Sequence, residues 1–113
     1  MTEKLKLNKE FRRTYGRGKS VVNHALVCYI LHCGGDNIRY GITVSKKLGK
    51  AVKRNRAKRL ISAAFRSVSA NIKPGTQVVF VARSAIFNQK SYQIAQTMRS
   101  SFISAGAWEE YDR

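Results

Sequence analysis

The sequence predicts an α+β fold, a single-domain α-β sandwich in which helices pack on a central sheet. Three observations predict it. A chain of 113 residues has room for one hydrophobic core. Hydrophobic residues make up 43% of the chain, which is ordinary for a globular protein. The spacing of hydrophobic residues along the chain fits helices and strands in the order α-β-β-α-β-α. We place residues 1–113 in one domain, with a core from about residue 7 to 105 and a short acidic C-terminal tail.

The first element is a short helix in a strongly basic segment. Asn8 can cap it, and Phe11 and Tyr15 lie four residues apart, on one helix face. Gly16 and Gly18 end it. From spacing alone, a buried face explains the two aromatic side chains better than a binding face does.

Two strands follow. His24–Cys33 is nearly continuous in strand-forming residues, and both of its faces look largely covered. Ile38–Ser45 alternates between apolar and polar residues. The Gly34–Asn37 segment between them has the glycines and polar residues of a tight turn, so we predict a β-hairpin.

A second helix runs from near Lys50 to about Ala70. Its core-facing stripe follows the helical period and consists of Ala57, Leu60, Ile61, Ala64, Phe65 and Val68. Val52 does not fit this stripe. Either the helix begins after Ala51, or its first turn packs against something else.

The last two elements follow a turn at Lys73–Gly75. Gln77–Arg83 reads as a buried strand. A third helix, capped by Ser91 and ended by Gly106, completes the fold. One face of it carries Ile94, Ala95, Met98, Phe102 and Ala105.

The charge balance is the outlying feature of the composition. Lysine and arginine total 22 and the acids six, for a formal charge of +16, and no acid occurs between Asn37 and Trp108. Unpartnered cations repel one another and destabilise a compact state. A polyanion would relieve this repulsion, and nucleic acid is the usual one.

A membrane partner is the weaker interpretation, because no helix combines Lys and Arg with a Trp, Phe and Leu face. No apolar run approaches the ~20 residues of a membrane span, and no signal peptide is visible. We therefore expect a cytoplasmic protein without membrane contact.

Cys28 and Cys33 are the only cysteines, with His24 and His32 nearby. Their number alone leaves a disulfide or a zinc site open. A reducing cytosol disfavours the disulfide, and no second ligand pair follows for zinc. We interpret both cysteines as ordinary strand residues.

The segment from Ser45 to Arg66 is the most informative about function. It holds nine cations and no acid: Lys46, Lys47, Lys50, Lys53, Arg54, Arg56, Lys58, Arg59 and Arg66. Exposed helices usually carry opposite charges four residues apart, and this one does not. Since its other face is core-like, a folded RNA-binding helix explains the run better than a solvated face or a localisation signal. If ~6 phosphates are neutralised, the log–log slope of affinity against salt should be near −5 for a duplex.

The same segment carries a family resemblance. It contains Lys46-Lys47-Leu48-Gly49, then Ala51-Val52, then Arg54-Asn55-Arg56-Ala57-Lys58-Arg59-Leu60-Ile61. Upstream lie Phe11, Tyr15, Gly18 and Ser20, and Gly41 to Ser45 precede the lysines. This pattern resembles the bacterial ribonuclease P protein component over roughly residues 7 to 105. Ser62 departs from it, because many relatives have a basic residue there.

The resemblance implies a fold and a function. The fold would contain a left-handed β-α-β crossover, against the usual hand. The protein would bind a catalytic RNA and the 5′ leader of precursor tRNA. The RNA would hold the catalytic centre and need magnesium, so the chain alone would hold neither a catalytic residue nor a metal. The basic residues listed above, together with Asn55, would contact RNA. Phe11, Arg12, Tyr15, Arg17 and Tyr29 would form a cleft for the single-stranded leader.

Three alternatives stay open at this point. Composition equally permits another structural RNA-binding protein, such as a ribosomal one. A protein-only nuclease would need clustered carboxylates or a placed base, and the acids here are few and scattered. A membrane-active cationic protein is the most distant of the three.

Overall fold

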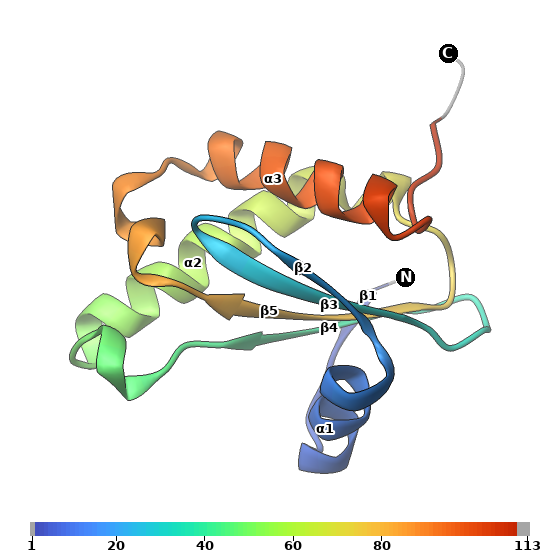
Figure 1. Cartoon of the computed structure of the whole chain (residues 1–113), viewed down its shortest axis with the longest axis horizontal. Coiled ribbons are helices and arrows are strands. Elements are labelled where there is room, and N and C mark those ends of the chain that lie inside the picture. Colours follow the sequence, from blue (N-terminus) through green and yellow to red (C-terminus); the bar gives the residue numbers. More distant parts are fainter. Residues whose placement is uncertain (1, 111–113) are drawn as a thin grey trace.

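The computed structural model describes residues 2–110 and confirms the predicted α+β class (Figure 1). One mixed sheet of five strands has the spatial order β1-β4-β5-β3-β2. Its strands are β1 Thr2–Lys4, β2 Lys19–Val22, β3 Leu26–His32, β4 Ile38–Thr43 and β5 Thr76–Ala82. The helices are α1 Asn8–Arg17, α2 Ala51–Val68 and α3 Ser91–Ser104, with short 3-10 turns at Lys46–Leu48, Ser69–Asn71 and Ser84–Asn88.

The predicted hairpin between β3 and β4 is wrong, because β5 lies between these strands. β5 is antiparallel to β3 and parallel to β4, so that Phe80 lies opposite both Cys28 and Ile42. The turn-forming residues Gly34–Asn37 between the two strands had led to the hairpin prediction. β5 is buried at every residue but Val81, and a strand buried on both faces belongs in the centre of a sheet.

The glycine-rich segment after β3 accordingly crosses over the start of β5 instead of closing a hairpin. The Cys33 N–H donates to the Gly75 carbonyl at 2.8 Å, and the Gly75 N–H donates to the Asn37 carbonyl at 3.1 Å. Gly75 has a φ of +84°, and a Cβ there would lie 2.8 Å from the Gly34 backbone. Only glycine fits this crossing without strain.

Two short strands were absent from the predicted order. β1 pairs in parallel with β4, and β2 forms a hairpin with β3. Strands of three and four residues with mostly exposed side chains show too little alternation to be recognised from sequence.

The parallel strands β4 and β5 are joined through α2, which makes a β-α-β crossover. It is left-handed: when α2 lies in front of the sheet and the strands point up, β5 lies to the left of β4 (Figure 1). This hand is the one the family resemblance implied, against the general preference.

The helix boundaries correct two predicted caps. Asn8 and Ser91 are the first helical residues and not the caps, and each helix start is held by a side chain three residues beyond its cap residue. The Glu10 carboxylate accepts from the Leu7 N–H at 3.1 Å, and the Gln93 side chain does the same for the Lys90 N–H at 2.8 Å. These contacts satisfy helix N–H groups that lack a helical acceptor.

The other helix ends are simpler. Gly16 lies inside α1, which ends at Gly18, and Gly106, at a φ of +74°, follows α3 as predicted. α2 begins at Ala51 and Val52 is 80% exposed, so neither explanation offered for Val52 holds.

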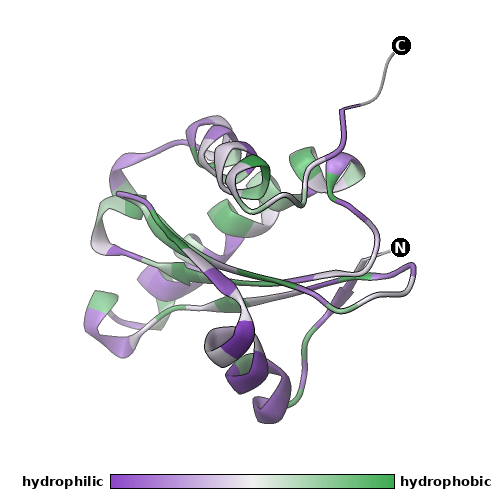
Figure 2. Ribbon diagram, turned by 45° about the vertical axis from the view of Figure 1, so that its right-hand side comes forward, coloured by the Kyte–Doolittle hydropathy of each residue, from purple (hydrophilic) through white to green (hydrophobic). Residues whose placement is uncertain are grey.

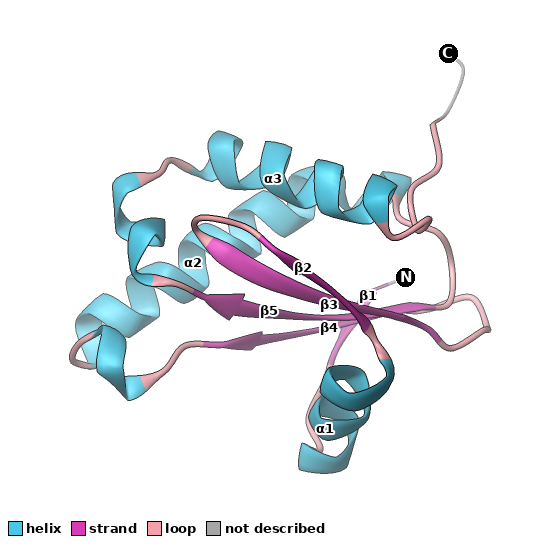
Figure 3. Cartoon of the chain, viewed as in Figure 1, coloured by secondary structure: helices cyan, strands magenta, loops and turns pink. Residues whose placement is uncertain are grey.

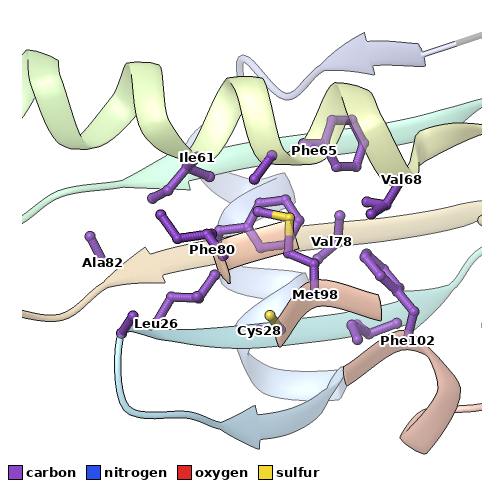
Figure 4. Close-up of a cluster of buried hydrophobic side chains, with 14 of the residues drawn as sticks. Leu26, Cys28, Ile61, Phe65, Val68, Val78, Phe80, Ala82, Met98 and Phe102 are labelled. Carbon is purple, nitrogen blue, oxygen red and sulfur yellow. The ribbon is translucent and has the colours of Figure 1, made fainter. Parts of the chain in front are cut away.

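The hydrophobic core lies between one face of the sheet and the pair α2 and α3 (Figure 4). Ile61, Phe65 and Val68 of α2 point toward Val78 and Phe80 of β5. Met98 and Phe102 of α3 and Leu26 and Cys28 of β3 complete the cluster. The Phe65 and Phe80 rings lie 5.6 Å apart and those of Phe80 and Phe102 6.2 Å apart, both edge to face. The predicted α2 stripe is therefore confirmed as core, with Leu60 at its partly buried margin.

In the part of the chain that the structure describes, the other face of the sheet carries only α1, which covers part of it (Figure 3). Val27, Tyr29 and Leu31 of β3 point to this side and are half-buried, so the expectation that both faces of the strand are covered is wrong. Most residues of α1 are hydrophilic (Figure 2). A half-covered face beside a basic helix is where a binding groove can form.

Both cysteines are free thiols. Cys28 is buried in the core, and Cys33 is exposed just beyond the end of β3. Within residues 2–110, no three His, Cys, Asp or Glu side chains lie close enough to hold a metal ion together. Along the same residues, no helix has the length and apolarity needed to cross a bilayer.

Burial raises the pKa of the Cys28 thiol from 9.0 to about 12, partly offset by a hydrogen bond with Ser101. Because the folded pKa exceeds the unfolded one, the stabilisation is complete below pH 9 and is lost as the pH rises toward 12. We expect the free energy of unfolding to fall above pH 9 with an extra slope of up to ~1.4 kcal/mol per pH unit. Denaturant unfolding of the unmodified chain and of Cys28→Ala between pH 8 and 11 measures this slope. Tyrosines and lysines contribute equally to the pH dependence of both proteins, so the difference between the two curves reports on Cys28. Parallel curves for the two proteins would contradict this assignment.

Candidate nucleic-acid interface

α1 is fixed on the sheet by one close apolar contact and one buried polar contact. The Phe11 ring lies against the backbone of Gly41 on β4, where an added Cβ would come within 2.5 Å of a ring carbon. Thr14 is fully buried, and its hydroxyl accepts from the Gln77 amide of β5 at 2.7 Å. These contacts set the height of α1 above the sheet and hence the width of the space beside it.

A groove of about 580 Å³ runs along one side of α1. Its lining residues are Asn8, Phe11, Arg12, Tyr15, Ile42, Thr43, Val44 and Lys58. Phe11 and Tyr15 are half-buried, so each ring presents part of its surface to the groove. Tyr15 is held in place by a 2.7 Å hydrogen bond to Thr43 and by the edge of Tyr29, whose ring centre lies 4.9 Å away.

The structure brings together only part of the residues expected in the cleft. Phe11, Arg12 and Tyr15 line the groove. Tyr29 lies behind Tyr15 and supports it, so its contact with a ligand would be indirect. Arg17 is exposed at the last turn of α1 and does not line the groove.

Sequence reasoning missed the residues that β4 contributes. Ile42 and Thr43 of β4 and Val44 just after it line the groove, and so does Asn8 at the start of α1. The alternation of Ile38–Ser45 predicted the strand, but it could not predict that α1 lies beside these residues. Which face of the sheet α1 covers depends on long-range packing. Only the family resemblance led us to expect a groove, because the Phe11–Tyr15 spacing by itself favoured a buried helix face.

The exposed side of α2 is basic along its length. Asn55, Arg56, Lys58, Arg59 and Arg66 are exposed, as are Lys46, Lys47 and Lys50 in and after the preceding 3-10 turn. Arg54 is only half-buried, yet its Nε is buried and has no hydrogen-bond partner within residues 2–110. Lys53 is directed over the Phe87 ring, 4.6 Å from its centre.

These cations have no acidic partners among the described residues. The two ion pairs found there join Arg39 to Glu10 and Arg99 to Glu110. Neither pair includes a residue of α2 or of the lysine-rich turn before it. A large part of the uncompensated charge that the sequence predicted therefore lies along α2 and the turn before it, and such a basic surface meets the electrostatic requirement for binding a polyanion.

Lys58 connects the aromatic groove to this basic surface. It lines the groove, a smaller hollow of about 180 Å³ with Lys4 and Ser62, and an open hollow of about 640 Å³ along α2. Asn55, Arg59 and Arg66 line the last of these. The groove and the basic face of α2 therefore adjoin each other at Lys58. Ser62, where the family resemblance led us to expect a basic residue, lines both of these hollows.

The contact between Phe11 and Gly41 gives a direct test of how the groove is built. We expect Gly41→Ala to displace the Phe11 ring and loosen α1, lowering the free energy of unfolding by roughly 1–3 kcal/mol. Gly16→Ala is the matched control, because nothing lies within 4 Å of its added Cβ and alanine favours the helix by up to ~1 kcal/mol. Chemical denaturation measures both. Equal stability of the two variants would show that α1 does not pack on β4 as described.

A protein-family model described as "Ribonuclease P" matches residues 1–106. Among curated proteins, the "Ribonuclease P protein component" of Caldanaerobacter subterraneus subsp. tengcongensis is 39% identical over 110 residues, covering 97% of this chain and 95% of that protein. The protein of the same name from Clostridioides difficile is 51% identical over 83 residues, covering 73% of each chain.

Solved structures agree with these sequence matches. The RNase P protein of Staphylococcus aureus superposes with a TM-score of 0.77 at 33% identity, covering 94% of this chain and 97% of that one. The RNase P protein of Thermotoga maritima gives 0.76 at 28% identity, covering 88% and 94%. The similarity extends over most of this chain in both structures.

Proposed function

Because this chain belongs to the ribonuclease P protein family, we propose that its groove and its basic helix bind two parts of one ribonucleoprotein complex. The chain is a protein subunit of ribonuclease P, the endoribonuclease that matures the 5′ ends of tRNA. Its partner is RNA. The ribosomal alternative is not favoured, since the family match spans residues 1–106.

The groove along α1 is the proposed site of the 5′ leader of precursor tRNA. Phe11 and Tyr15 offer ring faces on which bases can stack without strong sequence preference. Arg12 on the rim and Lys58 at the end can pair with backbone phosphates. The groove is open to solvent and is lined mainly by α1 and by β4 with the residue after it, which suits a flexible single strand better than a duplex.

The basic face of α2 is the proposed site of the catalytic RNA. Arg56 and Arg59 are exposed and free to grip phosphates in a bidentate manner, and Asn55 adds a donor and an acceptor between Arg54 and Arg56. The single observation that carries the proposal is the position of Lys58, which lines both the groove and the basic hollow. A leader in the groove would therefore meet the catalytic RNA at α2.

We expect magnesium to be bound by the RNA subunit and to supply the hydrolytic chemistry there. The residues of this chain would position RNA and reduce phosphate repulsion. We place the complex in the cytoplasm, where precursor tRNA is made in bacteria.

Reconstitution tests this function. The purified chain is added to a transcript of the ribonuclease P RNA, and leader removal from precursor tRNA is measured at low magnesium with and without protein. We expect faster cleavage with the protein, and no cleavage by the protein alone. Multiple turnover by the RNA-free chain would overturn the assignment of catalysis to the RNA. Co-purification with ribosomal RNA in place of one dominant RNA would restore the ribosomal alternative.

A further inference from the structure

Another hollow, separate from the two that Lys58 lines, lies on the flank of α1 opposite the groove. Its volume is about 390 Å³, and its lining residues are Lys9, Glu10, Arg13, Arg39 and Gln77. The helical period places Lys9 and Arg13 one turn apart on this flank, away from Phe11 and Tyr15. Neither the sequence motif nor the groove accounts for these cations.

The one acid in this hollow is already committed to internal contacts. One oxygen of Glu10 pairs with Arg39, and the other accepts from the backbone N–H groups of Lys6 and Leu7 at 3.4 and 3.1 Å. Within residues 2–110, Lys9 and Arg13 have no acidic partner. Three cations and one acid leave a formal charge of +2 on the lining residues, and like charges four residues apart on a helix repel.

A buried side chain fixes the third cation. Gln77 is 2% exposed, its carbonyl oxygen accepts from Arg39 at 3.4 Å, and its amide nitrogen donates to Thr14 at 2.7 Å. The Arg39 side chain is thereby held between Glu10 and Gln77 while 39% of it stays exposed. A guanidinium held in this way loses little conformational entropy when it binds an anion.

We propose that Lys9, Arg13 and Arg39 form a second phosphate site, which binds the backbone of a folded RNA distinct from the strand in the groove. The hollow has no aromatic lining on which a base could stack, so it contacts phosphate without reading sequence. The body of α1, roughly 10 Å wide, separates it from the groove. α1 would then lie between two RNA segments, with bases on one flank and phosphates on the other. This inference rests on the proposed function, because it takes the groove to hold a single strand.

The test compares two variants with equal loss of charge. Lys9→Gln/Arg13→Gln removes two exposed cations of the hollow, and Lys73→Gln/Lys90→Gln removes two exposed lysines that line neither the groove nor the hollows beside α1 and α2. Affinity for the folded ribonuclease P RNA is measured over a series of salt concentrations. We expect the log–log slope of the hollow variant to become shallower by about 1–2, and that of the control by less than about 0.5. Affinity for a short single-stranded oligonucleotide should stay within about twofold for both.

Each other result is decisive. Equal slopes for the two double variants would overturn the site. An equal loss with the oligonucleotide would overturn it too, because the cations would then serve the strand in the groove. If the unmodified chain binds the oligonucleotide and the folded RNA no better than heparin, the proposed function falls first and the site falls with it. Thermal unfolding verifies that the variants are folded. If a double variant does not fold, one of its single substitutions is used instead, and the expected change in the log–log slope is then about 1.

Discussion

Replacing Arg54 and Arg56 with alanine should weaken assembly with the catalytic RNA by roughly thirtyfold, or about 2 kcal/mol. Arg56 is exposed and has no acidic partner in the described chain, so its charge is available to a phosphate. Arg54 is half-buried, and within residues 2–110 it has no acidic partner, so its charge too is uncompensated by the described part of the chain. Equilibrium binding of the labelled RNA subunit at fixed ionic strength measures the loss.

The control for the Arg54→Ala/Arg56→Ala variant removes the same amount of charge at another place on the surface. Lys73→Ala/Lys90→Ala also lowers the net charge by two but leaves α2 intact, so we expect only the small loss that long-range attraction accounts for. Raising the salt should shrink the difference between the two variants, since direct phosphate contacts are the salt-sensitive ones. A loss as large in the control would mean that the RNA responds to net charge alone. Thermal unfolding of Arg54→Ala separates lost packing from lost binding.

The fold could be predicted from the sequence where an element is long and periodic. The stripe of α2 and the apolar run of β5 were recognised because burial of one face, or of both, leaves a repeating pattern. Strand pairing left no such local pattern. Nothing in the residues of β3 and β4 says that a strand more than thirty positions later lies between them, and this misplaced the hairpin.

In the candidate site, too, local features could be predicted from the sequence and long-range ones could not. The cations of α2 and the pair Phe11 and Tyr15 are local features, and the structure places all of them at the surface or in the groove. The junction at Lys58 is not local, because it depends on α1, β4 and α2 meeting at one edge of the sheet. The hollow of Lys9, Arg13 and Arg39 escaped the sequence for the same reason: Arg39 comes from β4 and is held by Gln77 of β5.

Phe11→Ala and Tyr15→Ala should each weaken binding of precursor tRNA about tenfold, and only when the leader is long enough to enter the groove. Loss of one stacked base contact corresponds to ~1–3 kcal/mol. The expected dependence on leader length follows from geometry, because both rings line the groove and neither lines the hollow along α2. Affinity of the holoenzyme for a series of precursors with leaders of increasing length measures it.

Three comparisons make this division of labour testable. Tyr15→Phe keeps the ring and removes only the hydroxyl that bonds to Thr43, so most of the affinity should remain. Tyr92→Ala removes an exposed aromatic ring on α3, outside the groove, and should change nothing at any leader length. Tyr15→Ala should also leave assembly with the catalytic RNA intact, because that RNA is expected on α2. If leaderless tRNA lost as much affinity as a long-leader precursor, the rings would be packing residues, and the groove would have to be assigned to another ligand.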